Sequence, residues 1–177
     1  MNGKSHTQKL TSMKSSSSSI ALTCCLLLAL VASHAAFAAA AQCTFEIIVK
    51  TGGRGDAGTD SRVSLEVSAA RGPTLTITNL ESWGKMPAGH DYFERGHLDR
   101  FSGKGRCMPS EPCKMVLKSD GQGHKPGWYV DYVKVTQLGS GSPKERKWAV
   151  DQWLAIDEAP NQLFASRNGC GFAAALP

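Results

Sequence analysis

The sequence predicts an all-β domain built as a sandwich of two sheets, and three observations carry this prediction. Short segments alternate between apolar and polar residues, turn residues separate these segments, and helical patterns are scarce. Alternation with a period of two is typical of half-buried strands. Roughly eight such strands at this spacing favour a two-sheet sandwich.

The strands can be assigned in order along the chain. They are predicted at residues 44–51, 62–68, 74–78, 114–119 and 128–136. The first shows the pattern most plainly, because Phe45, Ile47 and Val49 share one face. Turns or loops are predicted at residues 70–73, 121–127 and 138–143. Residues 148–155 fit a helical turn or a strand, and the flanking turn residues favour the strand. Trp128 and Trp153 are expected in the core.

The N-terminal segment predicts entry into the secretory pathway. Lys4, Lys9 and Lys14 precede an apolar stretch at residues 20–32, and small residues with an A-x-A pattern follow. This order is typical of a cleaved signal peptide, and the stretch is shorter than the ~20 residues that span a bilayer. We therefore expect a signal peptide at residues 1–38, a domain at 43–170 and a C-terminal tail at 171–177. The destination is the cell exterior or the endoplasmic reticulum.

Charge and cysteine content narrow the function further. Without the three leader lysines, the chain has 17 basic and 15 acidic residues, so its net charge is +2. This small excess predicts no nucleic-acid surface. Four cysteines remain outside the leader, and in an oxidising compartment they predict two disulfides: Cys43, Cys107, Cys113 and Cys170. Three pairings are possible, and we favour Cys107–Cys113 with Cys43–Cys170.

Catalysis and zinc binding are not expected. The sequence has no G-x-S-x-G, no H-E-x-x-H and no glycine loop for phosphate. The Cys107-x5-Cys113 spacing is not that of a zinc finger, and His90, His97 and His124 follow no ligand spacing. The chain is expected to be a binding protein rather than an enzyme.

Four strings together resemble a PLAT (lipoxygenase-homology) domain. They are DAGTD at residues 56–60, DYFERG at 91–96, GWYV at 127–130 and VDQWLA at 150–155. More narrowly, the chain resembles small plant proteins with a signal peptide and one such domain, related to embryo-specific protein 3. The resemblance implies a sandwich of two four-stranded antiparallel sheets. It also implies a non-catalytic role at membranes or lipids, some use of calcium, and an association with seeds and stress.

The loop after the first predicted strand is a candidate calcium site. Asp56, Gly58, Thr59 and Asp60 can supply several of the six to eight oxygen ligands that calcium takes. The resemblance maps metal contacts onto the first three of these residues, and a second loop would add Asp91. The alternative is a turn that uses Gly and Asp for its geometry alone.

Aromatic and basic residues suggest where a partner binds. Trp83, Lys85 and Met86 are candidates for contact with a lipid surface, although Trp83 can equally be a buried ring that pins the sandwich. Glu94 and Arg95 are predicted to point to opposite faces of a strand, in an architectural role. The expected partner of this monomeric domain is a membrane lipid surface. The alternatives are a secreted protein, which would dock without lipid, and a carbohydrate.

Overall fold

The computed structural model describes residues 41–171, and the predicted signal peptide and most of the predicted tail lie outside them. These residues form eight strands and one short 3-10 helix. The elements are β1 (Gln42–Thr51), β2 (Val63–Ser68), β3 (Thr74–Ile77), η1 (Leu80–Trp83), β4 (Leu98–Arg106), β5 (Lys114–Ser119), β6 (Trp128–Leu138), β7 (Lys144–Leu154) and β8 (Phe164–Asn168). No helix in this part of the chain is long and apolar enough to cross a membrane.

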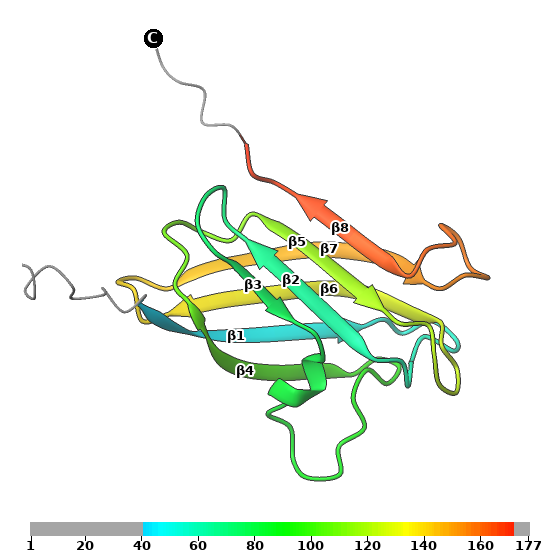
Figure 1. Cartoon of the computed structure of the whole chain (residues 1–177). Coiled ribbons are helices and arrows are strands. Elements are labelled where there is room, and N and C mark those ends of the chain that lie inside the picture. The colour runs from blue at the N-terminus through cyan, green and yellow to red at the C-terminus, as the bar shows by residue number, and fades with distance from the viewer. Residues whose placement is uncertain (1–40, 172–177) are drawn as a thin grey trace, which may run out of the picture. The chain divides into compact units, whose positions relative to one another are not determined.

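The strands form two four-stranded antiparallel sheets, as predicted. One sheet has the order β4-β1-β6-β7 and the other β3-β2-β5-β8 (Figure 1). Each strand turns its apolar residues inward with a period of two, as in β2, where Val63, Leu65 and Val67 are buried. The core fills the space between the two inner faces. Residues 148–155 lie in strand β7 and the loop that follows it, not in a helix.

Several loops meet at one end of the sandwich. Antiparallel pairing places the last residue of β1 beside the start of β6, and the end of β5 beside the start of β2. The connections at residues 52–62, 78–97, 120–127 and 155–163 therefore lie at one end, which we call the loop end. In Figure 1 this end is toward the right, and the 78–97 connection hangs below the sandwich. The connections at residues 69–73, 107–113 and 139–143 lie at the other end.

The disulfides differ from the favoured pairing. Cys43 is bonded to Cys107, and Cys113 is bonded to Cys170. The prediction was wrong because the 107–113 loop crosses from one sheet to the other, so Cys107 lies next to β4 of one sheet and Cys113 next to β5 of the other. Cys43 on β1 lies opposite Gly105 of the neighbouring β4, close to Cys107. Each bond therefore joins the ends of two neighbouring strands of one sheet.

The segment around Glu94 is also not a strand. Phe93 has a positive φ of 62° and lies in a turn before β4 begins at Leu98. The prediction of alternating faces for Glu94 and Arg95 was wrong, because a left-handed residue breaks the alternation. Phe93 is nevertheless fully buried, and its ring stacks on Phe101 and meets Trp128 edge-on. The aromatic ring anchors the turn, and the turn presents Glu94 at the loop end.

Candidate functional site

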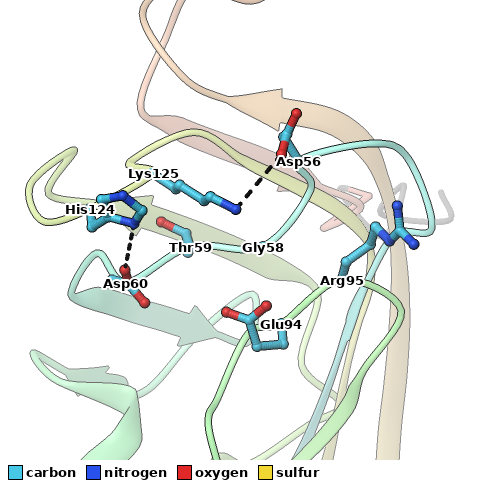
Figure 2. Close-up of a pocket in the computed structure, with 8 residues that line it drawn as sticks. All are labelled: Asp56, Gly58, Thr59, Asp60, Glu94, Arg95, His124 and Lys125. Atoms are coloured by element: carbon cyan, nitrogen blue, oxygen red, sulfur yellow. Dashed lines mark ion pairs between the residues drawn. The ribbon is translucent and has the colours of Figure 1, made fainter.

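The loop end contains a pocket of about 330 Å³ lined by charged residues from three loops. The lining residues are Asp56, Gly58, Thr59, Asp60, Glu94, Arg95, His124 and Lys125 (Figure 2). Four of the five predicted metal residues thus line one pocket: Asp56, Gly58, Thr59 and Asp60. The fifth, Asp91, joins them through the acidic cluster described below.

Hydrogen bonds hold the three loops together. The Thr59 hydroxyl donates to the carbonyl of Pro126 at 3.2 Å and accepts from the backbone N–H of Ser61 at 3.1 Å. The Ser61 hydroxyl donates to the carbonyl of Gln122 at 2.7 Å, and the Thr59 N–H donates to the carbonyl of Phe93 at 3.3 Å. The Thr59 hydroxyl therefore fixes the position of the loop relative to its neighbours.

The acidic groups that approach one another are Asp60, Asp91 and Glu94. One carboxylate oxygen from each of the three lies within 4.8 Å of the others. Glu94 was missed from sequence because its string was taken for a strand. Gly58 permits its position, since a Cβ at residue 58 would lie 3.0 Å from Glu94 Oε2 and 3.1 Å from the backbone nitrogen of Arg95. A substitution at Gly58 would therefore push against Glu94.

Asp56 lies apart from this cluster. Its side chain is 88% exposed and faces Lys125, with Nζ 3.9 Å from Oδ1. Asp60 Oδ2 lies 3.8 Å from His124 Nδ1, also in the open. Exposed pairs of this kind contribute little to stability, so they leave both carboxylates accessible to a cation.

The electrostatic field around the cluster is negative. Partial burial raises the pKa of the Glu81 carboxyl, and the neighbouring Asp91 raises it further, as does Asp60, while Arg62 lowers it. Asp60 and Asp91 of the cluster therefore add to the effect of burial on the pKa of the Glu81 carboxyl. Arg95 and Lys125 oppose this field from the pocket wall, and they lower the affinity expected for calcium.

Trp83, the candidate lipid contact, packs on the protein. A Cβ at Gly103 would lie 2.4 Å from the Trp83 ring, so the indole covers the bare backbone of β4, and it packs against the core. Met86 is half-buried and its N–H donates to the Tyr92 hydroxyl at 3.1 Å, whereas Lys85 is exposed. The geometry favours the alternative in which Trp83 pins the sandwich. Of the two expected core tryptophans, Trp128 is buried and Trp153 is half-buried.

Three other apolar residues are exposed at the loop end and were missed from sequence. Ile156 is 72% exposed, Phe164 45% and Leu98 37%, and they are the large hydrophobic residues exposed within residues 41–171. Ile156 lies two residues after the end of β7, and Phe164 and Leu98 begin β8 and β4. The available signal was that Ile156 ends an apolar run directly before the turn sequence DEAPN at residues 157–161.

Comparisons with known proteins agree with this architecture. Residues 45–163 match the PLAT/LH2 domain model. PLAT domain-containing protein 2 of Arabidopsis thaliana is 46% identical over 132 residues, which cover 73% of this chain and 72% of the relative. PLAT domain-containing protein 3 of the same plant is 46% identical over 104 residues, 57% of this chain and all of the relative. These relatives are named as domain proteins and not as enzymes.

Solved structures share the fold. A coral 8R-lipoxygenase, described as activated by calcium through a C2-like domain, superimposes with a TM-score of 0.53 at 21% identity. The match covers 71% of this chain but 16% of the lipoxygenase, so it concerns the sandwich alone. The family match over residues 45–163 and the identity of 42–46% to plant PLAT domain-containing proteins show that the chain belongs to the PLAT/LH2 domain family.

Proposed function

We propose that the protein is a non-catalytic binding module of the secretory pathway whose loop end docks on lipid surfaces with the help of calcium. One observation carries the proposal: an acidic cluster and the exposed apolar residues lie at the same end of the sandwich. Calcium at the cluster supplies positive charge to a lipid headgroup, while apolar side chains enter the interface. The calcium activation described for the coral lipoxygenase supports this choice of ion.

The ligands of the ion are Asp60, Asp91 and Glu94. Oxygen-rich sets of this kind suit calcium, and the remaining positions are filled by water or by the lipid. Because two cations line the pocket, we expect a weak site, with a Kd of about 10⁻⁴–10⁻³ M as in extracellular modules. Two disulfides fit passage through an oxidising compartment.

Replacing Asp60 and Asp91 together by asparagine should abolish calcium binding. For a Kd near 1 mM, calcium at about 10 mM should raise the free energy of unfolding of the unchanged protein by about 1.4 kcal/mol. The double variant should show no such rise, because two of three charged ligands lose their charge while keeping their shape. Thermal unfolding in calcium and in EDTA measures this stabilisation for the unchanged protein and for the double variant.

The matched control is Glu111→Gln, which removes one exposed carboxylate at the opposite end of the sandwich. Its stabilisation by calcium should equal that of the unchanged protein. Equal stabilisation of the double variant would place calcium elsewhere and contradict the assignment.

Replacing Ile156 by serine should weaken attachment to phosphatidylcholine–phosphatidylserine vesicles. Burying this side chain in the interface contributes about 1–2 kcal/mol, so its loss should lower the apparent affinity roughly five- to thirtyfold. Vesicle co-flotation in calcium measures the change. Ile156→Leu, which keeps the apolar area, should bind as the unchanged protein does. Equal loss in both variants would mean that the residue acts through local structure and not through burial.

A further inference from the structure

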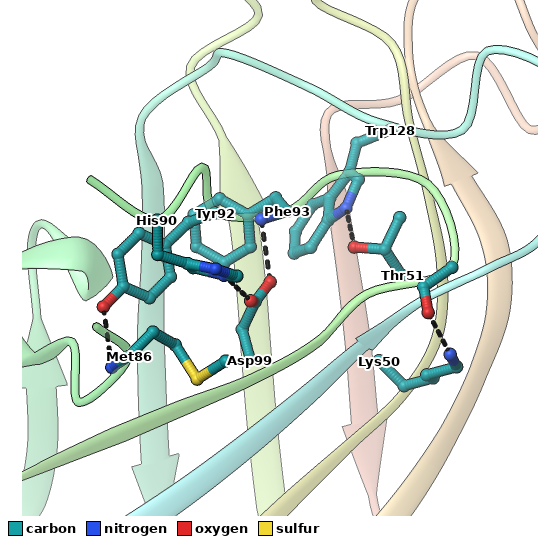
Figure 3. A network of polar contacts seen from close by, with 9 residues as sticks. Lys50, Thr51, Met86, His90, Tyr92, Phe93, Asp99 and Trp128 are labelled. Atoms are coloured by element: carbon teal, nitrogen blue, oxygen red, sulfur yellow. Dashed lines mark hydrogen bonds and ion pairs between the residues drawn. The ribbon is translucent and has the colours of Figure 1, made fainter. Parts of the chain in front are cut away.

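Asp99 is a buried carboxylate at a position that the strand pattern reserves for core residues. It faces inward from β4 opposite Val49, and its exposed fraction is 0%. Burying a charge is costly unless it is paired. Within residues 41–171 no lysine or arginine lies within ion-pair distance of it. Its partners are His90, whose Nε2 lies 2.6 Å from Oδ1, and the Phe93 N–H, which donates to Oδ2 at 2.8 Å (Figure 3).

A second histidine completes a compact group. The rings of His90 and His97 stack with centroids 5.4 Å apart and an interplanar angle of 26°. One donor atom from each of His90, His97 and Asp99 lies within 4.8 Å of the other two. The His90 side chain is 17% exposed and His97 is exposed, so the group opens to solvent on one side.

We propose that His90, His97 and Asp99 bind a divalent first-row transition-metal ion such as Zn²⁺, with water in the remaining position. Two imidazoles and one carboxylate form a donor set that favours these ions over calcium, which takes oxygen ligands. In a tetrahedral site with bonds of about 2.0–2.2 Å, donor atoms lie about 3.3–3.6 Å apart. Binding therefore requires His90 Nε2 and Asp99 Oδ1, which lie 2.6 Å apart, to separate to that spacing. Metal binding requires unprotonated donor atoms, so a proton on a donor nitrogen or oxygen is released to solvent when the ion binds.

The surrounding contacts hold the ligands in place. The Phe93 N–H donates to the second oxygen of Asp99, and the Tyr92 and His90 rings form a T-shaped pair with centroids 4.8 Å apart and an interplanar angle of 86°. The Met86 N–H in turn donates to the Tyr92 hydroxyl. Partners of this kind orient metal ligands and tune their affinity. Asp99 is buried and forms the inner side of the site, whereas His97 is exposed and forms the side that faces solvent.

The metal would tie the loop to β4. His90 and His97 flank Asp91 and Glu94 in sequence, and Asp99 lies on the strand itself. An ion shared by both histidines and Asp99 therefore holds the segment that presents the two acidic residues. This site differs from the calcium site in its donor chemistry, so either can exist without the other.

Zinc titration of the full chain, secreted in oxidised form and stripped of metal with EDTA, tests the proposal. Isothermal titration in calcium-free buffer should show one Zn²⁺ per chain. His97→Asn should weaken binding at least tenfold, whereas His124→Asn, which changes an exposed histidine outside the group, should leave it unchanged. Because His97 is exposed, His97→Asn should unfold at the same temperature as the unchanged protein in EDTA.

Three outcomes would overturn the proposal: no zinc binding by the unchanged protein, equal binding by His97→Asn, or a loss in His124→Asn as large as in His97→Asn. The double variant Asp60→Asn/Asp91→Asn should still bind Zn²⁺, since neither residue belongs to the group. If the protein binds calcium but not zinc, the proposed function stands and the zinc site is wrong. If it binds zinc but not calcium, the zinc site stands and the calcium site is wrong.

Discussion

Replacing Trp128 by alanine is expected to lower the free energy of unfolding by about 3–5 kcal/mol, as is typical of large buried aromatic residues. Trp128 is fully buried where β6 begins, and its ring meets Phe93 with centroids 5.0 Å apart. Its indole N–H donates to the Thr51 hydroxyl at 3.0 Å, and Thr51 is itself fully buried at the end of β1. The substitution thus leaves a cavity and an unpaired hydroxyl in the interior.

The substitution of Trp128 should also weaken calcium binding at the loop end. Phe93 anchors the turn that presents Glu94, so the alanine variant should bind calcium more weakly than the unchanged protein under conditions where both are folded. Urea unfolding gives the stability change. Trp153→Ala is the matched control, because Trp153 is half-buried and meets the Tyr129 ring edge-on. A Trp128→Ala loss no larger than the Trp153→Ala loss would contradict this account of the core.

Removing either disulfide should cost about 4 kcal/mol in the chain-entropy model. The bond between Cys43 and Cys107 spans 64 residues of sequence, and that between Cys113 and Cys170 spans 57. Loops of that length lose on the order of 4 kcal/mol of chain entropy when they are closed in the unfolded state. We expect a drop of this size for Cys113→Ser/Cys170→Ser, measured by urea unfolding of the oxidised protein.

The connectivity gives a sharper test than the magnitude. A Cys107–Cys113 bond would close a loop of six residues, worth only about 2 kcal/mol in the same model. Mass spectrometry of a non-reduced digest should recover peptides joined through Cys43–Cys107 and Cys113–Cys170. A peptide that links Cys107 to Cys113 would contradict the structure.

Much of the fold follows from local pattern. The strand at residues 44–51 falls within β1, and that at 114–119 coincides with β5, because alternation reports directly which residues face the core. The signal was weak for β8, where Ala165 alone is buried, and for the second half of β4. In β4 the Trp83 ring lies against Gly103, and the Phe45 and Leu75 side chains lie against Gly105, so neither position has room for a larger residue.

What could not be predicted depends on which strands are neighbours. Disulfide pairing follows from the orders β4-β1-β6-β7 and β3-β2-β5-β8, and local pattern does not reveal the order of strands. Asp60 and Asp91 were identified as candidates because acidic turn residues are visible in sequence. Glu94 was not, since its position rests on the left-handed turn at Phe93. His90, His97 and Asp99 are brought together by the same turn, without any recognisable ligand spacing.

Flotation of the full-length secreted protein with phosphatidylcholine–phosphatidylserine vesicles, first in calcium and then in EDTA, tests the central claim most directly. The acidic cluster and the exposed Ile156 at the loop end predict that the protein floats with the vesicles in calcium and is released by EDTA. Failure to float in either condition would contradict lipid docking and turn the search to a secreted protein partner. Equal flotation in both would contradict the role of calcium.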